Sequence, residues 1–148
     1  MPEKPHKRPQ NRTEQATLLL KKAKKQTALA RAGVEMDSDD VAITFLFQAL
    51  ENAVRAAAKV TGQFAETAKH WDLSGQASEL VDQSYLRTNV SDALDELNQS
   101  RKTSAYGYEE DFEHPEFHES LEEIEEFIAE VDELIKRGGK KLEKMEQQ

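Results

Sequence analysis

Apolar residues recur at every third or fourth position over long stretches of this chain, and this period constrains the fold more than any other feature. The clearest series lies within residues 38–67: Ile43, Leu46, Phe47, Leu50, Ala53, Val54, Ala57, Thr61 and Phe64. Such spacing gathers apolar side chains on one face of an α-helix. No segment alternates apolar and polar residues as a half-buried strand does, so we expect an all-α fold.

Four helices are predicted, at about residues 13–32, 38–67, 88–105 and 120–137. Gly33 has the character of a C-cap residue for the first helix. Ser120 and Glu123 form a capping box at the start of the fourth, and Gly138 with Gly139 ends it. A short extra helix is expected between the second and third. Amphipathic helices joined by loops predict an up-and-down antiparallel four-helix bundle.

The charge of the chain is divided unevenly. Residues 1–31 hold nine Lys or Arg against two acids, whereas the remainder has a net charge of −16. Residues 1–12 are expected to be a disordered basic arm, 13–137 the bundle, and 138–148 a frayed tail. Two interpretations of the basic residues stay open: an auxiliary phosphate contact, or an ordinary solvated surface.

The composition also bounds the location of the protein. There is no cysteine, which excludes disulfides and thiolate chemistry. The longest apolar runs are too short to cross a bilayer, and the basic N-terminus has no apolar signal region. We therefore expect a cytoplasmic protein without a membrane segment.

The stretch "SRKTSAYGYEED", residues 100–111, holds the best candidate site. Val90, Leu94 and Leu97 step along the apolar face of the third helix, and the next position in that series is Arg101. An unpaired charge there is costly, so either the arginine head reaches solvent or it serves a ligand. An arginine can hold a phosphate with two hydrogen bonds, and Tyr106 and Tyr108 could stack on a base or donate to it.

The histidines give weaker signals. His114 and His118 have the i,i+4 spacing of a helical metal pair, but Pro115 disrupts such a helix, so no metal site is predicted. His70 lies near a predicted helix end, where it could cap carbonyl groups or join the polar site. No sequence feature calls for a cofactor.

The order and spacing of the segments resemble those of HEPN domains (higher eukaryotes and prokaryotes nucleotide-binding) over about residues 15–136. The resemblance is carried by "FLFQALENAVRAAAKVTG", "AKHWDLSG", "LDELNQSRKTSAYG" and "ESLEEIEEFIAEVDELI". It implies a helical bundle, commonly a homodimer, in which active members cleave RNA with an R-x-x-x-x-H motif. Arg101 matches the Arg of that motif, and Tyr106 stands at the His position.

The resemblance implies a binding module more than a nuclease. We expect it to engage RNA, a nucleotide or a minimal nucleotidyltransferase partner, as part of a toxin–antitoxin pair. Its polar site would contain Arg101, Lys102, Tyr106, Tyr108 and His70. Two alternatives stay open: a metal-independent RNase in which His114, His118 or another group replaces the motif His, and a structural dimerisation bundle.

Overall fold

The computed structural model describes residues 11–63, 73–105 and 117–143, with the backbone alone for 103–105. These residues form five helices and no strand, which confirms the all-α prediction. The helices are α1 (Arg12–Glu35), α2 (Asp39–Thr61), α3 (Leu73–Asp82), α4 (Ser91–Ala105) and α5 (Phe117–Lys136). None of them is long and apolar enough to cross a membrane.

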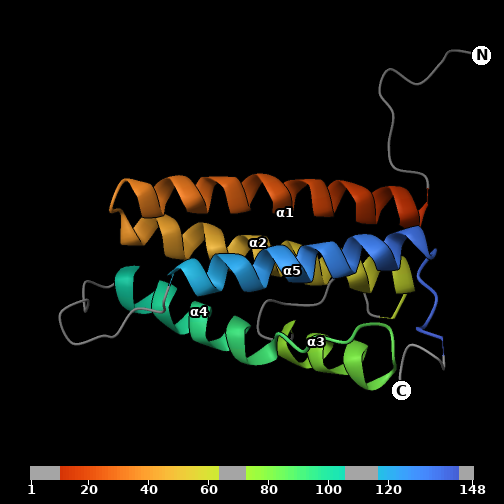
Figure 1. Cartoon of the computed structure of the whole chain (residues 1–148). Helices are drawn as coiled ribbons and strands as arrows, with labels where there is room; N and C mark the ends of the chain where they lie inside the picture. Colours follow the sequence, from red (N-terminus) through yellow and green to blue (C-terminus); the bar gives the residue numbers. More distant parts are fainter. Residues whose placement is uncertain (1–10, 64–72, 106–116, 144–148) are drawn as a thin grey trace, which may run out of the picture.

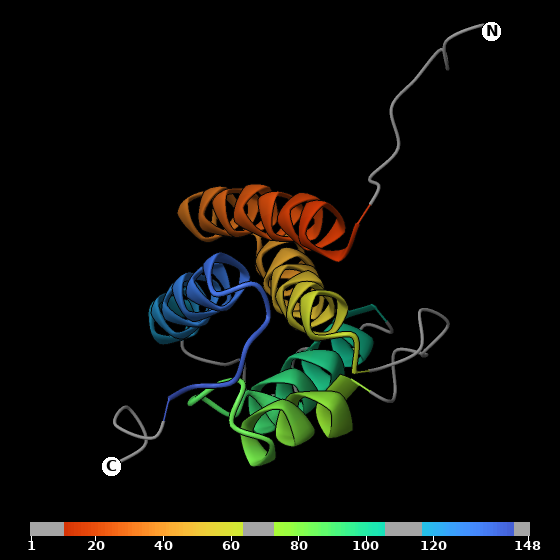
Figure 2. The same cartoon turned by 90° about the vertical axis from the view of Figure 1, so that its right-hand side faces the viewer.

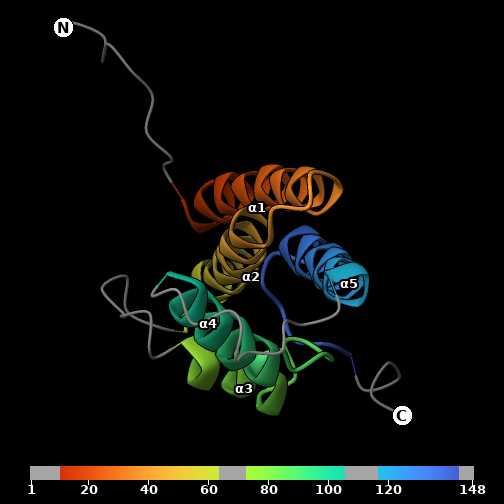
Figure 3. The same cartoon turned by 90° about the vertical axis from the view of Figure 1, so that its left-hand side faces the viewer.

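Helix α2 lies at the centre of the structure. It packs against α1 and α5 on one side and against α4 and α3 on the other (Figures 2 and 3). The four long helices alternate in direction along the chain (Figure 1), as predicted. However, the backbones of α4 and α5 do not pack closely on each other. The described helices therefore surround α2, and they do not close the ring of a regular four-helix bundle.

Small residues make this central position possible. Ala49, Ala53, Ala56 and Ala57 of α2 are fully buried, and α1 packs on α2 along most of its length. Gly33 of α1 is also buried, and a Cβ atom added to it would lie 2.8 Å from the backbone nitrogen of Ala42. The two backbones can approach this closely only because no side chain separates them.

Gly33 is consequently not the C-cap residue that the sequence suggested. Helix α1 continues past it to Glu35, and the turn into α2 is made by Asp37, whose φ of 56° is left-handed. The N–H of Met36 donates to the carbonyl of Ala32 at 3.0 Å, and the N–H of Ser38 donates to that of Gly33 at 2.8 Å. The glycine was required for helix packing, whereas an aspartate supplies the turn.

Other predicted boundaries need similar corrections. Helix α2 ends at Thr61, six residues early, because Gly62 takes a left-handed φ of 68° and its N–H donates to the carbonyl of Ala58 at 3.0 Å. Helix α4 begins at residue 91 and not at 88. Helix α5 begins at Phe117, so Ser120 lies inside its first turn and is not an N-cap. The predicted extra helix corresponds to α3.

The segment after α5 packs on the helices, although the sequence suggested a frayed tail. Gly138 and Gly139 have positive φ and end α5 as predicted. Beyond them, Leu142 is buried and its N–H donates to the carbonyl of Ser84 at 2.8 Å. Residues 1–10 and 144–148, which belong to the predicted arm and tail, lie outside the described residues.

The contact at Gly33 gives a test of this packing. We expect Gly33→Ala to lower the free energy of unfolding by about 1–3 kcal/mol, because the new methyl group forces α1 away from the α2 backbone. Gly75→Ala is the matched control: it lies in α3 with open space around its Cα, so we expect a gain of about 0.5–1 kcal/mol. Urea unfolding of both variants measures the difference, and equal effects would contradict the close approach.

Candidate functional site

Arg101 occupies the position that the periodicity of α4 assigns to it. Val90, Leu94 and Leu97 are buried in the core, and Arg101 follows in the same series and is partly buried. Its guanidinium carbon lies 5.0 Å from the centroid of the Phe47 ring on α2. At this distance the cation is attracted by the face of the ring, so the head group lies against α2 and does not simply extend into solvent.

Asn98 fixes the direction of this guanidinium. The Nη2 group of Arg101 donates to Oδ1 of Asn98, one helical turn earlier, at 2.8 Å. The Nε atom is enclosed and has no hydrogen-bond partner in the described part of the chain. Within that part, no carboxylate lies at ion-pair distance from Arg101. An oriented arginine without an acid partner can bind an anion, to whose oxygens its N–H groups donate.

The other arginines with recorded contacts are engaged differently. Arg31 pairs with Glu125, and Arg55 pairs with Glu51 at 3.3 Å. The Nη2 group of Arg137 donates to the backbone carbonyl of Tyr85 at 2.8 Å. Arg31 and Arg55 each meet a carboxylate, and Arg137 is held by backbone carbonyls, whereas the recorded contacts of Arg101 are one side-chain amide oxygen and a ring.

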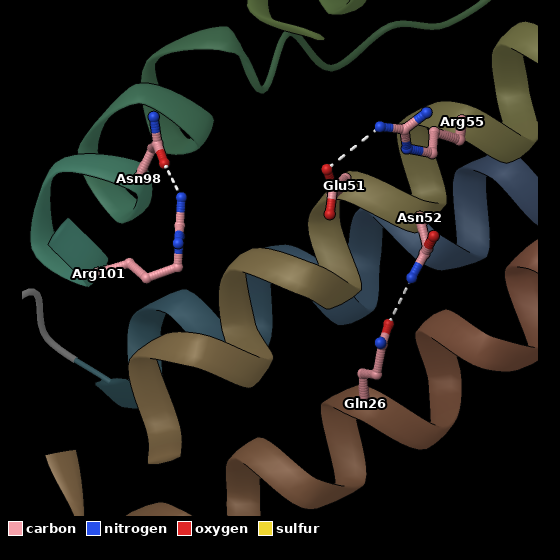
Figure 4. Close-up of polar contacts among 6 residues, drawn as sticks. All are labelled: Gln26, Glu51, Asn52, Arg55, Asn98 and Arg101. Carbon is pink, nitrogen blue, oxygen red and sulfur yellow. Dashed lines mark hydrogen bonds and ion pairs between the residues drawn. The ribbon is translucent and has the colours of Figure 1, made fainter. Parts of the chain in front are cut away.

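A second polar pair lies on the same side of α2. Glu51 is buried, and its contact with Arg55 lies one turn beyond Phe47 (Figure 4). The Asn98–Arg101 pair approaches from α4 on that side, while the hydrogen bond from Asn52 to Gln26, 2.7 Å long, lies on the α1 side of α2 (Figure 4). Helix α2 therefore separates a polar α1 contact from the polar surface next to Arg101.

A cavity near the other end of α4 does not compete for the same ligand. It has a volume of about 340 Å³ and lies between the start of α4 and the middle of α5, with Leu50 and Ile124 in its wall. The charged residues of its wall are Asp92, Glu123 and Glu126, whose carboxylates repel phosphate groups. Anion binding in the described region is therefore better placed at Arg101, about 14 Å along α4 from Asp92.

The structure describes only part of the predicted site. Arg101 and Lys102 are both on α4, and Lys102 is exposed. Tyr106, Tyr108, His70 and His114 lie outside the described residues. His118 is exposed in the first turn of α5, and no group of three or more His, Cys, Asp or Glu in the described residues could hold a metal ion.

Two residues of the site were missed by the sequence analysis. Asn98 could have been found, because a polar side chain three positions before an arginine lies beside it on a helix. Phe47 was predicted to be a core residue, and it is buried. Nothing in the sequence indicates that its ring faces α4 and lies against the guanidinium of Arg101.

One of three comparisons with known proteins identifies a family for this chain. The family model described as HEPN domain matches residues 16–140, which is most of the chain and includes all five helices except the first turn of α1. Comparisons with curated proteins and with solved structures gave no significant match. On the extent of the family match, the chain belongs to the HEPN family.

Proposed function

We propose that the protein is an RNA-binding module that holds a backbone phosphate on Arg101. The observation that carries this proposal is the guanidinium itself: it rests on Phe47, is oriented by Asn98, and has no carboxylate partner in the described region. Membership of the HEPN family supports the choice of ligand, because HEPN domains are in general RNA-binding or RNase-like modules.

The charge of the protein shapes how such binding would occur. The net charge is −9, so the protein as a whole repels RNA. Recognition then depends on a local contact that overcomes this repulsion, and a fixed arginine forms stronger and more directional phosphate contacts than a flexible lysine. Exposed Lys102, the next residue, adds positive charge beside it.

Several finer expectations remain predictions. A homodimer, a nucleotidyltransferase partner and a toxin–antitoxin role rest on the resemblance alone. The roles of Tyr106, Tyr108 and His70 rest on residues outside the described part. The proposal for Arg101 depends on none of them.

Arg101→Met separates a binding role from a structural one. Methionine keeps an apolar stem against Phe47 and removes a partly buried charge without an ionic partner, so we expect the free energy of unfolding to stay within about 0.5 kcal/mol or to rise. Arg137→Met is the control. It removes two hydrogen bonds to backbone carbonyls, so we expect a loss of about 1–3 kcal/mol. Urea unfolding measures both, and a large loss for Arg101→Met would indicate a structural role.

The same variant tests RNA binding. We expect the wild-type protein to bind a fluorescently labelled single-stranded RNA at low salt, and Arg101→Met to weaken that binding at least about tenfold. The negative slope of the logarithm of the association constant against the logarithm of the salt concentration should become shallower by about 0.7. This is the value for one phosphate contact on a single strand. Fluorescence anisotropy over a salt series measures both quantities.

Lys140→Met provides the matched control, because it removes one exposed positive charge beyond α5. It should change affinity less than about twofold, within the range of a surface charge. Electrophoresis of the recovered RNA shows whether it is intact. Cleavage by the wild type that Arg101→Met abolishes would identify an RNase, and equal binding by the wild type and Arg101→Met would reject the proposed site.

A further inference from the structure

The cavity between the start of α4 and the middle of α5 has an apolar floor. Leu50 of α2, Ile124 of α5 and Val90, which directly precedes α4, are wall residues, and all three are buried. The volume of about 340 Å³ equals that of about eleven water molecules and lies at the lower end of the range of about 300–1,000 Å³ for small-molecule sites. The cavity therefore has room for a small organic molecule.

Negative charge enters the wall of this cavity from two helices. Asp92 comes from α4 and Glu123 and Glu126 come from α5, and all three side chains are exposed. None of them has an ion-pair partner among the residues that the structure describes. No Lys or Arg is among the described wall residues. Three carboxylates around one hollow with an apolar floor repel one another and attract cations.

The two sides of the cavity are held in place by the protein itself. Glu130, one turn after Glu126, accepts hydrogen bonds from the backbone N–H groups of Arg87 and Thr88 at 2.7 and 3.0 Å, and from the Thr88 hydroxyl at 3.0 Å. These bonds tie the segment before α4 to α5. Both helices also pack on α2, although they do not pack closely on each other (Figure 3). The space is thus already formed, which lowers the cost of binding.

The carboxylates surround the cavity but do not converge on one point. Glu123 and Glu126 are three positions apart on α5, so their Cβ atoms lie about 5–6 Å apart, and Asp92 belongs to another helix. No group of three or more His, Cys, Asp or Glu in the described residues could hold a metal ion. Separate positive charges joined by an apolar chain match this arrangement better than a single metal ion.

We propose that this cavity binds a linear polyamine, an aliphatic chain with two or more ammonium groups. The methylene groups pack on Leu50, Val90 and Ile124, as the stem of a lysine packs on apolar surface, while the ammonium groups reach the carboxylates. The site is separate from Arg101, and neither proposal depends on the other.

Other ligands satisfy only part of the wall. A neutral apolar molecule would fill the floor and leave the carboxylates repelling one another. An inorganic cation would reduce that repulsion and leave the apolar floor in contact with water. A phosphate group is repelled by all three acids.

Matched probes test the ligand class. In isothermal titration calorimetry of the full chain at low salt, we expect spermidine to bind with a Kd of about 10–500 µM. The diamine 1,6-diaminohexane should bind at least about tenfold more tightly than 1,6-hexanediol, which has the same chain without charge. MgCl2 should weaken spermidine binding by no more than about threefold beyond NaCl at the same ionic strength.

Charge variants test the location. Glu123→Gln/Glu126→Gln keeps the shape of the wall and removes two of its three carboxylates, so spermidine should bind at least about tenfold more weakly. Glu35→Gln/Glu79→Gln is the control, because it removes the same charge from exposed positions on α1 and α3. It should change the affinity less than about twofold.

A steric variant separates the cavity from the charged surface around it. Ala93→Leu enlarges a wall residue without changing any charge, so spermidine should bind at least about tenfold more weakly. Ala129→Leu adds the same atoms at an exposed position of α5 and should leave binding unchanged. Thermal melting checks that each variant is folded. Should Ala93→Leu unfold, Asp92→Asn takes its place and should weaken binding at least about threefold.

Four outcomes reject the proposal. The first is a wild-type protein that does not bind spermidine at low salt. The second is an equal loss of affinity in the two double variants, which indicates attraction to the net charge of the chain. The third is unchanged binding by folded Ala93→Leu, since the ligand then lies outside the cavity. The fourth is equal binding of the diol and the diamine, which indicates a site for neutral apolar molecules. None of these measurements uses RNA, so their failure leaves the Arg101 proposal untouched.

Discussion

The close approach of α1 to α2 is the contact on which the rest of this structure depends. Gly33 has no side chain, and the alanines of α2 have small ones, so the two backbones meet with little between them. This leaves other faces of α2, with its larger residues Phe47, Leu50 and Val54, to receive α4 and α5. A single central helix thus organises the described core, and the surrounding helices need not contact one another equally.

The position of α2 explains why a charged residue is tolerated at Arg101. Phe47 projects from α2 toward α4, and its ring provides a surface for a cation that has no acid partner in the described residues. Burying such a group without full satisfaction costs free energy. Natural proteins accept that cost most often where function requires it, and in this respect Arg101 differs from Arg31 and Arg55, which pair with carboxylates.

The sequence predicted which segments form helices better than it predicted where each helix begins and ends. The periodicity of α2 and α5 was clear because each carries a long series of large apolar residues. The ends of α1 and α2 were wrong because the two glycines have opposite roles: Gly33 allows packing inside a helix, whereas Gly62 ends one. Glycine is compatible with both roles, and only its neighbours in space decide which applies.

The sequence by itself determined the helical class, the family resemblance, the uneven charge and the unusual place of Arg101, because each of these depends on residue order and local spacing. Tertiary structure alone decided that the Phe47 ring lies against the guanidinium of Arg101, and that α4 and α5 do not pack closely on each other. These features depend on contacts between residues far apart in the chain, such as the 54 positions from Phe47 to Arg101. The helical period sets which face of each helix is apolar, but it does not set which partner that face meets.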